Sequence, residues 1–328
     1  MKPSIFDVAK RAGLSVVTVS RVLNGAGTVR EKNRLKVLEA IRELDYRPSA
    51  AARSLARGRT GTIGLILTTL HDSFFDTVAK EINDLLAMQG YYLAISVSTG
   101  LSEHGEHYMM QEDRLDGMIL LSPVEEKELA DELAKRDIPY VIIDNQLPQH
   151  SAEAISIDNA HGGYIAGRHL LELGHRRIVH LCGDELFLST RERRSGFTQA
   201  LKEAGVEPLV EQGTYTVAFG YETGQRWLQE GTLPEAVFAG NDYIAIGLIN
   251  SLMNGGIRIP HDLSIIGYDD QNISSQLRPL LTTVRQPADE MARTAVELLL
   301  NKMNQPEQPV QGICIRPQLI VRESTAAR

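Results

Sequence analysis

The 328-residue chain lacks the marks of several protein classes. No apolar run approaches the roughly 20 residues that a membrane-spanning helix needs. The first residues lead into a patterned segment without a signal peptide, so we expect a cytoplasmic protein with no membrane partner. The two cysteines, Cys182 and Cys314, lie far apart in apolar runs, which indicates buried reduced thiols in place of a disulfide framework.

Catalytic motifs are missing as well. The sequence contains no GxSxG, Walker A, HExxH or GxGxxG motif, and "GAGTVR" (25–30) follows a helical pattern without the strand that a dinucleotide site requires. His104 and His107 in "EHGEH" favour a solvated polar patch over a metal site. We therefore expect no enzyme, no catalytic residue, no cofactor and no metal.

Charge is distributed unevenly along the chain. Residues 1–60 hold 13 Lys and Arg against five Asp and Glu, a balance of +8, whereas the whole chain carries −8 and the remainder therefore −16. A basic head on an acidic body indicates that the head contacts a polyanion. A solvated charged face would give the same totals.

The head reads as three short helices. Ile5–Ala12 and Val16–Asn24 are separated by Gly13, which can take the positive φ of a sharp turn, and Ser15 can cap the second helix. Glu31–Asp45 is the third helix. Its predicted apolar side consists of Val37, Leu38, Ile41 and Leu44.

From Thr62 onward, short apolar segments alternate with amphipathic ones. The predicted strands are Ile63–Thr68, Tyr92–Val97, Gly117–Ser122, Tyr140–Asp144, Ala154–Ile157, Ile178–Cys182, Ala236–Ala239 and Leu263–Tyr268. The predicted helices include Thr77–Gln89, Gly163–Leu173, Arg193–Ala204, Gly220–Gln229 and Tyr243–Met253. This alternation predicts parallel sheets covered on both faces, and its restart near His161 indicates two similar α/β lobes.

The first two head helices form a helix-turn-helix pattern, whose second helix would enter a DNA major groove. Arg21 can bond two acceptors of one guanine, and Val16 and Val17 can pack against thymine methyls. Four polar side chains can donate to phosphates: Ser15, Thr18, Ser20 and Asn24. A three-helix scaffold without nucleic acid is the alternative.

Long segments of the chain resemble a known family. "IFDVAKRAGLSVVTVSRVLNG" (5–25) and "VREKNRLKVLEAIRELDYRPSAAARSLARGRTGTIGLIL" (29–67) resemble the lactose-repressor/galactose-repressor family of bacterial transcription regulators. The similarity continues in "IDNAHGGYIAGRHLLELGHRRI" (157–178), "AVFAGNDYIAIGL" (236–248) and "IRIPHDLSIIGYDD" (257–270), and so covers essentially the whole chain. It implies a helix-turn-helix head (1–48), a hinge helix and linker (49–60), and a periplasmic-binding-protein-like effector and dimerisation body (61–328).

The resemblance also assigns the hinge and the lobes. It makes 49–57 a hinge helix that folds on DNA, with Leu55 wedged into the minor groove between Arg53 and Arg57, which meet phosphates. Packing of Leu55 against the body is the alternative. The second lobe would start near 161, and the chain would cross back near 286.

An effector pocket is implied at seven positions that match the family pattern: Phe74, Phe75, Asp144, Arg193, Tyr215, Asn241 and Asp269. Carboxylate, amide and guanidinium groups suit sugar hydroxyls. Other roles are open for these residues, as core aromatics, a helix cap, a turn or a surface ion pair. Phe187 stands where purine-binding members place a second arginine, with Ser189 nearby, which favours a neutral sugar or polyol.

We therefore expect a repressor that binds an inverted-repeat double-stranded DNA operator under the control of a small ligand. The end "LIVRESTAAR" shows no heptad repeat, so we expect a homodimer. The alternatives are a sugar-binding module or a sugar-metabolising enzyme with an incidental basic head.

Overall fold

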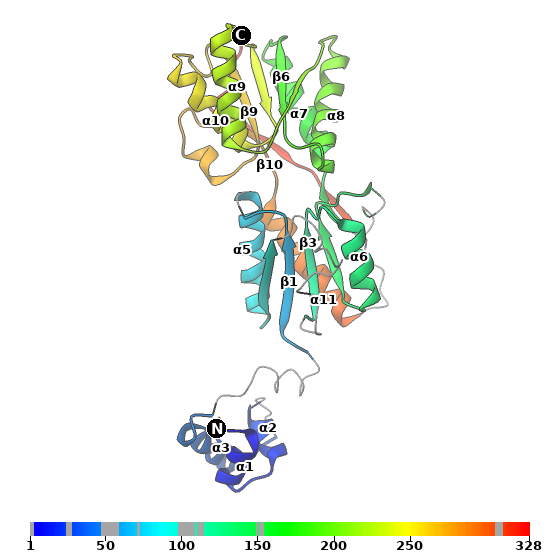
Figure 1. The fold of residues 1–328 in the computed structure, drawn as a ribbon, viewed down its shortest axis with the longest axis vertical. Helices are drawn as coiled ribbons and strands as arrows, with labels where there is room; N and C mark the ends of the chain where they lie inside the picture. Colours follow the sequence, from blue (N-terminus) through cyan, green and yellow to red (C-terminus); the bar gives the residue numbers. More distant parts are fainter. Residues whose placement is uncertain are drawn as a thin grey trace. The chain divides into compact units, whose positions relative to one another are not determined.

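The computed structural model of the protein describes residues 3–23, 28–46, 59–70, 73–97, 109, 115–148, 150, 154–305 and 311–328. The chain divides into two compact units, Met1–Gly61 and Thr62–Arg328. We call these the head and the body and describe each by itself (Figure 1).

The head contains the helices α1 (Ile5–Ala12), α2 (Val16–Leu23) and α3 (Glu31–Glu43). Gly13 ends α1 in the left-handed region with φ 64°, as its position between the helices predicts. The three helices share one small core that consists of Val8, Ala9, Ala12, Val19, Val22, Val37, Ala40 and Tyr46. The turn at Gly13 thus places α2 across α1 while both contribute to the same core.

One predicted core residue of α3 is wrong. The side chain of Leu38 is 51% exposed, whereas Val37 and Ala40 are buried. Each residue of an α-helix is rotated by about 100° from the one before it. Once Val37 and Ala40 point at α1 and α2, Leu38 is carried beyond the edge of the buried stripe.

The body contains two six-stranded sheets. The first sheet has the order β11-β5-β4-β3-β1-β2 and all its described pairs are parallel. The second has the order β12-β10-β9-β8-β6-β7 and is parallel except for β12 against β10. The strands of the first sheet are β1 (Thr62–Leu67), β2 (Tyr92–Val97), β3 (Gly117–Leu121), β4 (Tyr140–Ile143), β5 (Ala154–Ile157) and β11 (Ile313–Ile315). Those of the second are β6 (Ile178–Cys182), β7 (Leu209–Gln212), β8 (Ala236–Ala239), β9 (Ser264–Asp269), β10 (Thr282–Arg285) and β12 (Gln318–Ile320).

Helices cover both faces of each sheet, as nearly continuous apolar strands require. In the first lobe, α5 (Ser73–Met88) and α11 (Ala288–Asn304) pack together on one face, and α6 (Glu126–Lys135) packs on the other. In the second lobe, α7 (Asn159–Glu172) pairs with α8 (Leu188–Glu203), and α9 (Val217–Glu230) pairs with α10 (Asp242–Asn254). Figure 1 shows the two pairs on opposite sides of the second sheet.

The structure confirms two parallel-sheet α/β lobes and adds elements that the sequence pattern did not predict, namely β7, β10, β11 and β12. β11 and β12 have only three residues each, which is too short for a predicted strand, and β7, "LVEQ", has only two apolar residues. Cys182 is buried, but Cys314 is exposed on edge strand β11, which corrects the expectation of two buried thiols.

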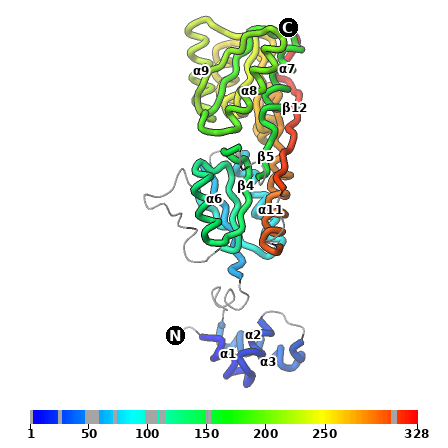
Figure 2. The backbone as a smooth tube through the Cα atoms, turned by 90° about the vertical axis from the view of Figure 1, so that its right-hand side faces the viewer, coloured from blue at the N-terminus to red at the C-terminus, as the bar shows by residue number. Residues whose placement is uncertain are grey.

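The chain passes between the lobes three times, at Asp158, at 286–287 and at 316–317. Figure 2 shows the last part of the chain running from α11 beside the first lobe to β12 in the second. These crossovers join the lobes along one side. Within the described ranges, no helix combines the length and the apolar character needed to cross a membrane.

Candidate functional site

A cavity of about 310 Å³ lies between the two lobes of the body, at the carboxyl ends of their parallel strands. Most of the polar lining comes from the ends of strands of both sheets and the short segments that follow them, and Ser189 and Arg193 come from the first two turns of α8. The first turn of α5 supplies Phe74 and Phe75. Ligands of open α/β sheets bind at this edge. The lining residues are Thr68, Thr69, Phe74, Phe75, Ser122, Asp144, Asp184, Phe187, Ser189, Arg193, Thr214, Tyr215, Thr216, Asn241, Asp269 and Gln286.

All seven residues that the resemblance assigns to an effector pocket are among these sixteen, and Phe187 and Ser189 line the cavity too. The structure therefore brings together segments that lie up to 195 residues apart, between Phe74 and Asp269. Phe74 and Phe75 also contact the core of the first lobe, so their packing and cavity-lining roles coexist.

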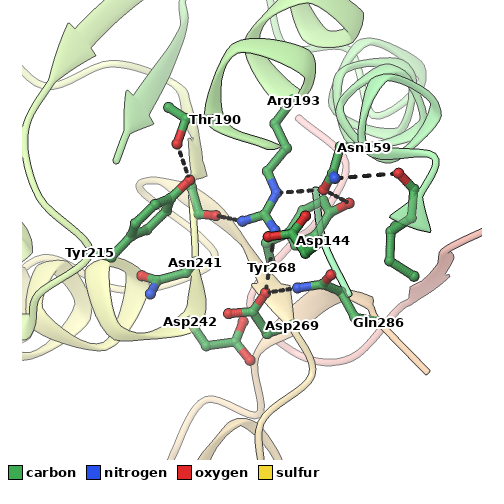
Figure 3. Close-up of polar contacts among 12 residues, drawn as sticks. Asp144, Asn159, Thr190, Arg193, Tyr215, Asn241, Asp242, Tyr268, Asp269 and Gln286 are labelled. Atoms are coloured by element: carbon green, nitrogen blue, oxygen red, sulfur yellow. Dashed lines mark hydrogen bonds and ion pairs between the residues drawn. The ribbon is translucent and has the colours of Figure 1, made fainter. Parts of the chain in front are cut away.

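Arg193 is the central cation of the cavity and is only 6% exposed. Its Nε donates to Asn159 Oδ1 at 3.0 Å and its Nη1 donates to the Gly240 carbonyl at 2.8 Å. The guanidinium stacks over the Tyr268 ring, 3.7 Å from the centroid, and Nη2 lies 3.8 Å from Asp269 Oδ1 (Figure 3). These partners fix the direction of the arginine before any ligand binds.

Asp144 and Asp269 face the cavity from opposite lobes. Both have positive φ, 56° and 106°, a conformation that is rare for residues with a side chain and that clusters at functional sites. Burial raises the pKa of Asp144, and the Ser122 hydroxyl, which donates to Oδ2 at 2.6 Å, opposes that shift. Asp269 Oδ1 accepts from Gln286 Nε2 at 2.6 Å. The two carboxylates are acceptors for hydroxyl donors of a ligand.

Aromatic rings form the apolar part of the lining. The Phe74 and Phe75 rings lie 5.9 Å apart in the first lobe, and those of Phe187 and Tyr215 lie 6.4 Å apart in the second. The Tyr215 hydroxyl hydrogen-bonds Thr190 at 2.6 Å, and burial raises the pKa of Tyr215 to about 12. Tyr215 is therefore a neutral phenol at physiological pH. Such rings suit the C–H face of a sugar.

Asn241 is both a cap and a cavity residue. Its Oδ1 accepts from Ile244 N at 2.9 Å and so caps α10, as the helix-cap alternative predicted. Its Nδ2 is buried without a partner among the described residues. Because Nδ2 has no partner there, Asn241 can offer a ligand a hydrogen-bond donor.

Sequence reasoning missed several lining residues, including Ser122, Asp184 and Gln286. Ser122 directly follows β3 and Gln286 directly follows β10. For Ser122, the position at the end of a predicted strand is a signal that could have identified it, because these ends of parallel strands share one edge of a sheet. β10 was not predicted, so Gln286 had no strand to mark it.

The predicted second helix of the head is α2. Ser15 Oγ accepts from Thr18 N at 3.2 Å, which caps the helix. Val19 and Val22 are buried, while Arg21 is exposed and Val17 is 61% exposed, four residues apart on the outer face. Val16 is half-buried against the head core, so only part of its side chain is available for a base contact. Thr18 and Ser20 are half-buried.

The predicted DNA contacts Asn24, Arg53, Leu55 and Arg57 lie outside the described residues, as do His104 and His107. Within the described ranges, no group of three or more His, Cys, Asp and Glu side chains is placed to hold a metal ion.

A helix-turn-helix head and a two-lobed body with a polar cavity at its strand ends define a ligand-controlled DNA-binding regulator. Residues 4–49 match the family "Bacterial regulatory proteins, lacI family", and residues 168–325 match "Periplasmic binding protein-like domain". The chain is 37% identical to the HTH-type transcriptional repressor PurR of Erwinia tasmaniensis, over 98% of this chain and 97% of that protein.

Solved structures agree with this match. A lac repressor dimer bound to operator and the anti-inducer ONPF is similar over all of both chains, with TM-score 0.89 and 28% identity. The transcriptional regulator CelR in complex with cellobiose is similar over 98% of this chain and 99% of that one, with TM-score 0.73 and 30% identity. The chain belongs to the lacI family of bacterial regulatory proteins, and it is a DNA-binding transcriptional regulator.

Proposed function

We propose that the protein is a homodimeric repressor whose affinity for an inverted-repeat operator is controlled by an uncharged sugar or polyol in the cavity between the lobes. Closure of the lobes around this ligand shifts the balance between DNA-competent and DNA-incompetent states.

The observation that carries the proposal is the composition of the cavity. Among the described residues that line it, three carboxylates, Asp144, Asp184 and Asp269, stand with one cation, Arg193. The cation is already directed toward protein partners, so an anionic ligand would meet an excess of like charge. Hydroxyl pairs match the carboxylate acceptors and the Asn241 donor, and the aromatic rings match a C–H face. The similarity to a regulator solved with cellobiose supports the same class.

In the head, we propose that α2 reads the major groove. Val17 and Arg21 lie on its exposed outer face, where an apolar contact and a bidentate contact can address neighbouring bases. Ser15, Thr18 and Ser20 are the phosphate-contacting candidates on the same helix. The side chain of Arg21 is exposed and is not part of the head core, so it is available to contact DNA.

A thermal-shift screen of the full chain against sugars, polyols, sugar phosphates and nucleobases tests the ligand class. We expect stabilisation by a neutral sugar or polyol, and none by its phosphate ester. The Asp269→Ala variant should lose that stabilisation and keep its affinity for the chain's own promoter DNA.

Two results would overturn this proposal. Stabilisation by sugar phosphates or nucleobases alone would contradict the ligand class. An Asp269→Ala variant with an unchanged ligand midpoint would remove Asp269 from the site.

A further inference from the structure

We infer that Gln146 of the first lobe caps helix α8 of the second lobe and thereby positions one wall of the ligand cavity. The inference rests on the proposed function for its consequence, because α8 matters to regulation only if the cavity binds the effector. Its evidence is a hydrogen bond between the lobes that lies beside the cavity.

Helix α8 begins without a cap of its own. Its N-cap residue is Phe187, which provides no side-chain hydrogen bond, and its first turn contains no acidic residue. The first amide groups of a helix have no partner within the helix. The Leu188 amide instead donates to Gln146 Oε1 at 2.8 Å. The cap that a neighbouring Ser, Thr, Asp or Asn usually supplies therefore comes from the other lobe.

The Gln146 side chain is held in place for this role. It is 8% exposed, and its Nε2 donates to the Asp144 carbonyl at 2.8 Å. Since both ends of the amide have partners, its orientation is defined: the oxygen points to α8 and the nitrogen points back to the first lobe.

Glu126 fixes the loop that carries Gln146. This carboxylate is 1% exposed, at the start of α6, and it accepts from the backbone amides of Gln146 and Leu147. His150 Nδ1 lies 2.5 Å from its other oxygen. A side chain from α6 thus clamps the loop after β4, and the loop presents Gln146 to α8. Such preorganisation lowers the ordering cost of the bond between the lobes.

The bond joins the two walls of the cavity. Asp144, whose carbonyl orients Gln146, lines the cavity from the first lobe. Phe187, Ser189 and Arg193, at the start of α8, line it from the second. A change in the separation of the lobes at this point must stretch or break the Gln146–Leu188 bond. The cap therefore forms only when the lobes have the separation seen in this structure. It couples the position of the cavity wall at the start of α8 to that separation.

Hydrogen exchange of the full-length, ligand-free chain tests the cap directly. In Gln146→Ala, we expect a peptide covering 187–193 to exchange on the order of tenfold faster, because the loss of a helix cap eases local opening. Peptides from β6 and α10 should exchange as in the wild type. Gln146→Glu keeps an acceptor for the Leu188 amide but loses the Nε2 bond to the Asp144 carbonyl, so its protection at 187–193 should lie between those of Gln146→Ala and the wild type.

Gln199→Ala is the matched control on the same helix. Gln199 is exposed and its Nε2 donates to Glu203, one turn further along the helix and away from 187–193, so its removal should leave the exchange of that peptide unchanged. Unchanged exchange of 187–193 in Gln146→Ala, or equal acceleration throughout the body, would overturn the inference. Because no ligand is added, a negative sugar screen on the wild type would overturn the proposed function while leaving this result intact.

Discussion

The guanidinium of Arg193 lies over the ring of Tyr268, 3.7 Å from its centroid, while the Tyr268 hydroxyl donates to the same Asn159 oxygen that Arg193 Nε uses. The arginine, the ring and the amide form one buried unit (Figure 3). Removal of one member leaves buried polar groups without partners, so the energetic cost exceeds that of a single contact.

Arg193→Lys tests this unit. Lysine cannot stack a planar group on Tyr268 while donating to both Asn159 and Gly240. We expect a loss of about 2–4 kcal/mol in the free energy of unfolding, measured by urea denaturation. Arg194→Lys is the control, because Arg194 forms a partly exposed pair with Glu185. A cost for Arg193→Lys as small as that of the control would contradict the role of the unit.

Gly196 allows α8 to approach α7 closely, because a methyl group there would overlap the Ala160 carbonyl oxygen. Gly163 on α7 meets the Arg193 carbonyl in the same way. We expect Gly196→Ala to destabilise the body by about 1–3 kcal/mol, as overpacking does. The exposed neighbour Ser195→Ala should be close to neutral in the same thermal unfolding assay. A stable Gly196→Ala variant would show that the helices can separate without cost.

Asp242 gives the protein a pH dependence near neutrality. Burial raises its pKa to about 7, against hydrogen bonds from Ser274, Thr283 and the Gln271 amide that lower it. A raised folded-state pKa means that the folded protein holds this proton more tightly than the unfolded chain does. Its contribution to stability is therefore full below pH 4 and is lost as the pH rises toward 7.

Asp242→Asn cannot titrate at this position. The stability of the wild type relative to this variant should fall by a few kcal/mol between pH 4 and pH 7.5, measured by urea unfolding at each pH. A difference that does not change with pH would show that Asp242 keeps an ordinary pKa in the folded protein.

His180 makes stability depend on pH in the opposite direction from Asp242. It lies in β6, stacked 4.4 Å from the Phe238 ring, and burial lowers its pKa to about 4. The folded state disfavours the charged ring, so stability is full above pH 6.5 and is lost as the pH falls toward 4. We expect His180→Phe to reduce the loss of thermal stability between pH 6.5 and pH 4.5. An equally steep loss in the variant would assign it to other groups.

Arg21→Ala separates base reading from general attraction to DNA. We expect specific affinity for the chain's own promoter to fall by about 1–3 kcal/mol and affinity for a scrambled duplex to fall much less, measured by fluorescence anisotropy at one salt concentration. Lys36→Ala, which removes an exposed cation of α3, is the control. It should lower the affinity for both duplexes by a similar small amount. Equal losses on both duplexes for Arg21→Ala would place its guanidinium on a phosphate.

The sequence predicted those parts of the fold that repeat a strong local pattern. Tyr92–Val97 and Ile178–Cys182 are apolar runs whose predicted bounds are the observed ones. β10, "TTVR", is buried in the second sheet over its first three residues, but its two threonines hide it from a search for apolar runs. Short strands are defined by their neighbours in the sheet, and the neighbours are not visible in a linear pattern.

The cavity also combines residues that the sequence could identify with contacts that it could not. The family resemblance assigned Arg193 and Asp269 to the cavity, since they lie in the segments "RERRSGFTQAL" (191–201) and "IRIPHDLSIIGYDD" (257–270), which resemble the family. The stacking on Tyr268 and the cap from Gln146 are contacts between segments 75 and 42 residues apart. Neither follows from spacing, because both depend on the angle at which helices and loops meet after the lobes have formed.

The three passages of the chain between the lobes bear on how this body can be divided or recombined. The second lobe is incomplete without β12, and the first without α11 and β11, so neither lobe is a continuous stretch of sequence. A chimera that exchanges one whole lobe with a relative needs three junctions, near 158, 286 and 316. A single crossover between two parental genes anywhere in 159–285 would mix strands of both parents in the first sheet, because β11 follows the crossover, and between β6 and β10 it would mix the second sheet as well. Recombination should therefore favour exchange of the head over exchange of a lobe.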